Sequence, residues 1–110
     1  MKRVRVKETE DAIYITALFE EKGVPHQASF SLYDGYLHCE VVPSSAAARG
    51  FMEMLRNTLG NPEDGPRVRE SYSDCGEEPG SLFASWKGDA TRESWKEAVL
   101  SALKKEGFEI

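Results

Sequence analysis

The chain has 110 residues, of which 40% are hydrophobic and 30% are charged, and its formal net charge is −5. This length is typical of one domain, residues 1–110, with a core large enough to fold without metal or disulfide support. The acidic balance argues against nucleic-acid binding, which depends mainly on neutralisation of phosphates by lysine and arginine.

The first two predicted elements are strands, at 2–7 and 12–20. In the first, Val4 and Val6 alternate with basic residues, which predicts a half-buried strand whose charges protect the edge of a sheet. The second, AIYITALFE, is rich in β-branched and aromatic residues. Because it is apolar on both sides, we expect it to be a central strand.

A β-hairpin is predicted at 27–42, QASFSLYDGYLHCEVV. Two alternating runs flank Asp34-Gly35, and an Asp-Gly pair in this position predicts a type I′ turn, with positive φ at both central residues. A preceding turn is predicted at 20–23. Together the two turns predict these pairs on one apolar face: Phe19 with Val24, Ile15 with Ala28, Ile13 with Phe30, Ala28 with Val41, Phe30 with Cys39 and Leu32 with Leu37.

Two amphipathic helices follow from apolar residues at helical spacing. The first spans 46–59 and begins after a cap by Ser44 or Ser45, and the second begins after a cap by Asp89 or Thr91. Their apolar positions are Ala47, Ala48, Phe51, Leu55, Thr58 and Leu59 in the first helix and Trp95, Ala98, Val99, Ala102 and Leu103 in the second.

Between the helices, strands are predicted at 67–72 and 81–87. We expect them to form a second hairpin, because a long loop without structure is unusual in a small domain. The predicted order of elements is ββββ-α-ββ-α. This order predicts an α+β fold, a two-layer sandwich in which an antiparallel sheet of about four to six strands carries both helices on one face.

Cysteines, histidines and acidic residues give no metal or cofactor pattern. Cys39 falls on the core face of a strand and His26 is expected at the surface near a strand end. The chain lacks the paired Cys/His spacing of a zinc site, so we expect no metal and no cofactor. The segment containing Asp74, Cys75, Glu77 and Glu78 lacks the spacing of a calcium loop and is predicted to be a solvated loop.

The candidate site lies on the sheet face opposite the predicted core. Tyr14, Tyr33, Tyr36, His38 and Glu40 all fall on that face by strand alternation. Tyrosine is enriched at interfaces, so these residues predict a partner-binding surface, although a plain solvated strand face would have a similar composition.

His38 and Glu40 could in principle form an acid/base pair. Their spacing on a strand is about 7 Å, which is too long for a direct hydrogen bond unless the side chains adjust, and Cys39 points to the other face. We therefore expect no catalytic residue and interpret the chain as leaning away from an enzyme.

Three functions stay open from the sequence. The first is an acidic protein-binding module (adaptor, chaperone-like or inhibitor) that uses the tyrosine-bearing face, with self-association as one form of it. The second is a small-molecule binder or minor enzyme with a pocket between sheet and helices, near Trp86 and Trp95. The third is weak nucleic-acid binding through Lys2, Arg3, Arg5, Arg67 and Arg69.

The location of the protein is predicted from what the sequence lacks. The basic N-terminus has no apolar run behind it, so we expect no signal peptide, and the chain has no apolar stretch long enough to predict a membrane span. These features and the unpaired cysteines predict a soluble cytoplasmic protein without membrane contact.

Overall fold

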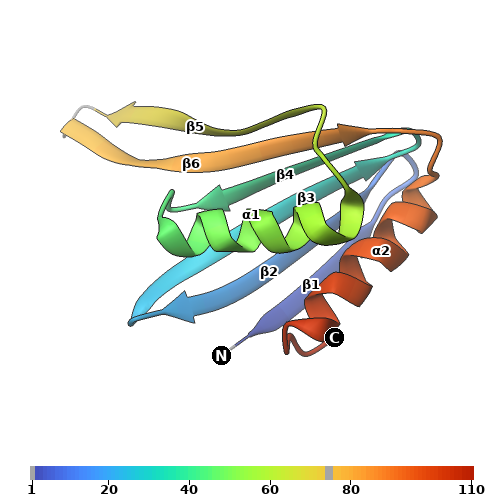
Figure 1. Ribbon diagram of the computed structural model, residues 1–110, viewed down its shortest axis with the longest axis horizontal. Coiled ribbons are helices and arrows are strands. Elements are labelled where there is room, and N and C mark those ends of the chain that lie inside the picture. Colours follow the sequence, from blue (N-terminus) through green and yellow to red (C-terminus); the bar gives the residue numbers. More distant parts are fainter. Residues whose placement is uncertain (1, 74–75) are drawn as a thin grey trace.

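The computed structural model contains a six-stranded antiparallel sheet and two helices, in the predicted order (Figure 1). It describes residues 2–73 and 76–110, and only the backbone of 70–73 and 76–79. The elements are β1 (Arg3–Glu8), β2 (Ile13–Glu21), β3 (Val24–Tyr33), β4 (Tyr36–Val42), α1 (Ala46–Leu59), β5 (Asp64–Ser73), β6 (Gly76–Lys87) and α2 (Arg92–Lys105).

Both helices cover the same face of the sheet, which confirms the predicted two-layer α+β sandwich (Figure 1). The strand order is β1-β2-β3-β4-β6-β5, so β6 pairs with β4 and β5 forms the edge. The two ends of the chain meet, because Arg3 and Glu109 form a parallel bridge. In the described part of the chain, neither helix is long and apolar enough to cross a membrane.

The core lies between the helices and the inner sheet face, where strand alternation and helical periodicity converge. Phe30 is 1% exposed at its centre, and its ring lies 6.1 Å from that of Phe51 on α1. Further strand residues in this core are Ile13, Ile15, Ala17, Ala28, Leu32, Leu37, Cys39, Val41, Leu82, Ala84 and Trp86. Helix residues in it are Ala48, Phe51, Met52, Leu55, Trp95, Val99 and Leu103. Thr58, predicted on the apolar stripe of α1, is exposed instead.

The predicted pairing of β2 with β3 was wrong by two residues. Glu21, not Phe19, lies opposite Val24, and Ile15 lies opposite Phe30. The turn contains only Lys22 and Gly23, with φ of 52° and 80°, the positive values that a two-residue type I′ turn requires. Because the error is an even number of residues, every side chain still points to its predicted face.

The Asp34-Gly35 turn keeps the predicted β3–β4 pairs but is not type I′. Gly35 has φ of 82°, whereas Asp34 is not among the residues with positive φ. Asp34 has another role here, since its Oδ1 accepts a 3.0 Å hydrogen bond from the Arg92 amide at the start of α2. A carboxylate at a helix N-terminus is favourable, so the turn ties the hairpin to α2.

The second hairpin is confirmed but is longer than predicted. β5 and β6 run through segments rich in proline and glycine that were predicted to be loops, and bulges interrupt their pairing. Gly80 permits this pairing, because an added Cβ would lie 2.5 Å from the Arg69 carbonyl oxygen. Glu77 and Glu78 belong to β6 rather than to a loop, while Asp74 and Cys75 lie outside the described residues.

Side-chain caps set where both helices begin. The Ser45 hydroxyl accepts a hydrogen bond from the Ala48 amide in α1, and the Thr91 hydroxyl accepts one from the Ser94 amide in α2. α2 ends in a Schellman motif, in which the Phe108 amide donates to the Leu103 carbonyl. This motif returns the Phe108 side chain to the core beside α1.

Candidate functional site

The candidate site lies on the sheet face that the helices leave uncovered, which we call the open face. The strand pairing places all five predicted residues there: Tyr14, Tyr33, Tyr36, His38 and Glu40. Tyr14 is 38% exposed and Tyr33 is 37% exposed, and the other three are half-buried. The face is therefore accessible, although neighbouring side chains cover much of each residue.

The three tyrosines form one group at the end of the open face nearest the β3–β4 turn. Tyr33 and Tyr36 are a cross-strand pair with ring centroids 6.1 Å apart. A hydrogen bond with the Tyr14 hydroxyl raises the pKa of Tyr33, with smaller contributions from the charge of Tyr14 and from burial. Tyr14 on β2 therefore lies close enough to the β3–β4 hairpin to affect the acidity of Tyr33.

Glu40 is the centre of a second, polar group. The Ser81 hydroxyl donates to Oε2 at 2.5 Å, and Arg69 Nη1 donates to Oε1 at 3.3 Å. His38 Nε2 lies 3.4 Å from the same Oε1, so the two side chains have made the adjustment that a contact across the expected spacing of about 7 Å requires. That expectation used backbone spacing, whereas side chains lean along a strand and can meet.

These contacts determine the acidity of Glu40. Burial alone would raise its pKa, but the hydrogen bond from Ser81, the contact with His38 and the charge of Arg69 outweigh that effect. The pKa of Glu40 therefore lies below its ordinary value of 4.5. A carboxylate with a lowered pKa stabilises the fold when it is ionised, and that stabilisation is lost as pH falls through the folded-state pKa.

We expect Glu40→Gln to lower the free energy of unfolding at pH 7 by ~1–2 kcal/mol, because two charge-assisted bonds are lost. The difference from wild type should begin to shrink as pH falls through 4.5, the ordinary value at which the carboxyl of the unfolded chain is protonated, and should be lost once pH falls below the lower folded-state pKa. Urea unfolding of both proteins at a series of pH values measures this difference in the free energy of unfolding. A difference that stays constant down to pH 2 would contradict the assigned ionisation.

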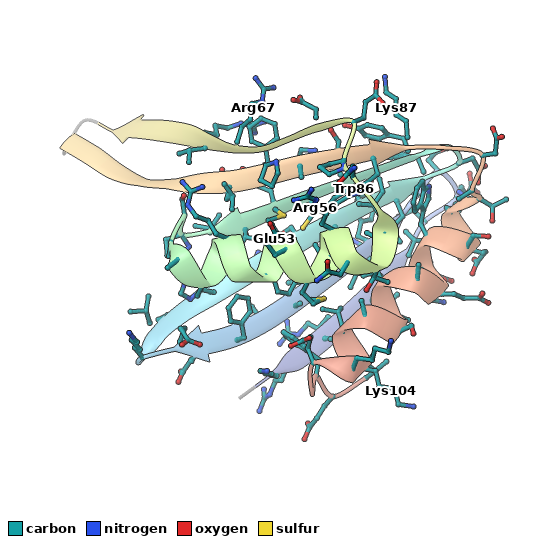
Figure 2. The ribbon with its side chains drawn as sticks, in the orientation of Figure 1. Glu53, Arg56, Arg67, Trp86, Lys87 and Lys104 are labelled. Atoms are coloured by element: carbon teal, nitrogen blue, oxygen red, sulfur yellow. The ribbon has the colours of Figure 1, made fainter. Side chains whose placement is uncertain are left out.

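Phe83 and two arginines lie beside the same polar group. Phe83 was not among the predicted site residues, and the arginines were predicted only for the nucleic-acid-binding alternative. Phe83 is the pairing partner of Glu40 on β6, and the guanidinium groups of Arg67 and Arg69 lie 5.0 Å and 4.8 Å from its ring centroid. Figure 2 shows Arg67 and Lys87 extending away from both helices. Alternation along 81–87 put Phe83 on the outer side, but no local signal indicated that β6 pairs with β4.

Positive charge occupies both margins of the open face. Among described side chains on this face, the cations are Arg3, Arg5, Lys7, Arg67, Arg69 and Lys87, and the carboxylates are Glu20, Glu40 and Asp64. Among the described side chains, this face therefore carries more cations than carboxylates, on a chain whose net charge is −5. Lys2, which the sequence grouped with these cations, points to the helix side and donates to the Glu106 carbonyl.

His26 is buried, and its predicted place at the surface was wrong. Its side chain is on the helix side, is 4% exposed in total and stacks on Phe19 with ring centroids 5.0 Å apart. Nδ1 lies 2.9 Å from the Val24 carbonyl oxygen and Nε2 lies 2.7 Å from the Ser45 hydroxyl. Since a carbonyl only accepts, Nδ1 carries a proton, and in the neutral ring the Ser45 hydroxyl donates to Nε2.

Ser31 and Ser85 lie opposite His38 on the neighbouring strands, but among the described side chains no hydroxyl or thiol is hydrogen-bonded to its ring. Cys39 is fully buried on the opposite face, and burial, followed by the charge of Glu40, raises the pKa of its thiol well above the ordinary range. Ser81 donates its hydroxyl proton to Glu40, not to His38. Among the described residues, no group of three or more His, Cys, Asp or Glu side chains is placed to hold a metal ion.

Two clefts lie at the margin of the helix layer, near the β2–β3 turn. One, of about 290 Å³, is lined by Phe51, Met54 and Phe108 with charged groups at its rim. The other, of about 410 Å³, is lined by Val24, His26 and residues that begin α1. Neither tryptophan lines these clefts: both are buried, and Trp86 donates to the Gly60 carbonyl under the end of α1 (Figure 2).

The open face can therefore offer aromatic surface, hydroxyl groups and cations to a partner over several strands. It has no enclosed cavity on the described residues that would surround a small substrate. Comparison of the chain with protein-family models, with curated proteins and with solved structures finds no match.

Proposed function

We propose that this chain is a small protein-binding module that recognises an acidic surface of a partner protein through its open face. The observation that carries the proposal is the excess of cations among the described side chains of that face, on an acidic protein and on the side of the sheet that carries no helix. Tyr14, Tyr33 and Tyr36 supply apolar area and hydroxyl groups at low entropic cost. The group around His38 and Glu40 supplies directional hydrogen bonds.

Charge complementarity favours a different protein as the partner over a second copy. Two open faces that met would bring like charges together, and such contacts oppose association. Size exclusion with light scattering separates the two cases. A dimer that persists at low salt would overturn the choice of an acidic partner.

The open face also resembles a stacking surface for single-stranded nucleic acid, since it combines aromatic rings with arginine. Two features favour an acidic protein instead. Arg67 and Arg69 are already placed over Phe83, and Arg69 is paired with Glu40 in the middle of the face. A long polyanion would also extend from this face onto a body in which carboxylates outnumber cations.

We expect the double substitution Tyr33→Ala and Tyr36→Ala to weaken partner binding by roughly 30-fold, the loss typical of interface hot spots. The fold should persist, because Tyr33 is exposed and Tyr36 only half-buried. Immobilised wild type and variant would capture partners from nuclease-treated lysate of the native host, and the captured protein would then be titrated after purification.

The matched control is Asn57→Ala with Ser101→Ala, two exposed positions on the helices. Binding should be unchanged in this control and partly retained in Tyr33→Phe with Tyr36→Phe, which keeps the rings. Equal capture by the alanine variant and wild type would overturn the proposal. Capture that disappears after nuclease treatment would identify nucleic acid as the partner instead.

The small-molecule alternative has less support from the described clefts. His26 and Ser45 in the larger cleft are already hydrogen-bonded to each other and to the backbone, so they offer a ligand few free polar groups. The cytoplasm is the location we propose, since two cysteines in the sequence do not predict a disulfide framework that would require an oxidising compartment. Cell fractionation of the native host tests the location.

A further inference from the structure

The edge of the sheet at β1 is a second surface with its own chemistry. β1 pairs with β2 on one side only and is the first strand in the sheet order. On its other side, the described structure pairs only the start of the strand. There Glu109 forms a parallel bridge with Arg3, and the Glu109 amide donates to the Lys2 carbonyl at 3.1 Å.

The two sides of this edge differ in character. Arg3, Arg5 and Lys7 point to the open face, are exposed, and form no ion pair with another described side chain. Val4 and Val6 point to the helix side, where Val6 is 41% exposed. A strand added along β1 would therefore meet cations on one side and apolar surface on the other.

The end of the chain shows which sequence suits this edge. Because bridged residues share a face, Glu109 lies on the same side as Arg3. Phe108 lies on the helix side, in contact with Phe19 and Phe51, and Ile110 follows with 61% exposure. The start of the β1 edge thus already accommodates a short segment, residues 108–110, in which apolar and acidic residues alternate.

We infer that the β1 edge binds an extended segment of a partner protein as an added strand, in which acidic and apolar residues alternate. Its carboxylates would lie beside Arg5 and Lys7, its apolar side chains would lie beside Val4 and Val6, and its backbone would pair with β1. This inference goes beyond the proposed function, because the edge is a separate surface from the tyrosines.

A second copy of the chain does not fit this edge. A two-fold axis would pair the β1 strands antiparallel, because a symmetric dimer uses the same patch twice. Centred on Arg5, that pairing sets Arg5 against Arg5 and Arg3 against Lys7. The basic residues that oppose pairing of the protein with itself are the ones that an acidic strand would neutralise.

The probe is a fluorescein-labelled, end-capped eight-residue peptide that alternates valine and glutamate. We expect it to bind the full chain in a polarisation titration, and to bind at least ~10-fold more weakly to Arg5→Glu with Lys7→Glu. The reversed variant should instead bind the peptide in which lysine replaces glutamate. In the wild-type protein, binding of the peptide should slow the amide exchange of residues 4–8.

A peptide with two central valines replaced by proline separates strand addition from general charge attraction, because proline cannot donate a backbone hydrogen bond. Loss of binding by this peptide supports the inference. Equal binding of the proline peptide, or no binding of any peptide, overturns it. Tyr33→Ala with Tyr36→Ala should leave peptide binding unchanged, so failure here is distinguishable from failure of the proposed function.

Discussion

Phe30→Ala is expected to lower the free energy of unfolding by about 3–5 kcal/mol, the range for removal of a buried phenylalanine. Phe30 is 1% exposed, lies between Ile15 and Cys39 on neighbouring strands, and faces Phe51 on α1. Its ring therefore joins three strands to a helix. A cavity at this point cannot close without moving the helix layer as a whole.

Urea unfolding followed by tryptophan fluorescence measures this loss, because Trp86 and Trp95 are both buried in the same core. The matched control is Ser29→Ala, one residue away on the open face, with an expected change within about 0.5 kcal/mol. A loss below about 1 kcal/mol for Phe30→Ala would contradict the placement of the core at this position.

Ser45→Ala is expected to destabilise the fold by about 2–4 kcal/mol, which is unusually large for a half-buried serine. Part of this loss is the N-cap of α1, where the hydroxyl accepts from the Ala48 amide. The rest arises because the buried His26 Nε2 loses its only described partner, and an unsatisfied buried polar atom is costly.

A double-mutant cycle with His26→Phe separates these two parts. In that background no ring nitrogen remains to be satisfied, so Ser45→Ala should cost only the cap, about 1 kcal/mol. Ser44→Ala is the matched control, since the Ser44 contact is a backbone one, from its amide to the Gly80 carbonyl. Equal losses in both backgrounds would show that Ser45 and His26 are not coupled.

The alternation of side chains along each strand was enough to predict which residues lie on the open face. The face of a strand residue depends only on whether it is an odd or an even number of positions from its neighbours on that strand. The error of two residues between β2 and β3 moved Ile15 from Ala28 to Phe30 and changed no face. Local signals also placed α1 at Ala46–Leu59 and gave Ser45 and Thr91 as candidate caps. These features depend on residues that are neighbours along the chain, so they can be predicted from a single sequence.

Contacts between distant segments could not be predicted in the same way. β6 reaches β4 only after α1 and β5, so the contacts of Glu40 with Ser81 and Arg69 join residues 41 and 29 positions apart. His26 was missed for the same reason, since its burial depends on Ser45 and Phe19 from other elements. No local pattern distinguishes a buried histidine from an exposed one beside a proline.

The most direct test of the open face as the binding surface is crosslinking from its centre. A photoreactive phenylalanine analogue would replace Ser31, which lies between Tyr14 and His38 in the strand pairing, or, as a control, the exposed Ser101 on α2. After illumination in nuclease-treated host lysate, we expect a protein adduct from position 31 that is absent from position 101 and is lost at high salt. An adduct from position 101 and none from position 31 would contradict an open-face binding site.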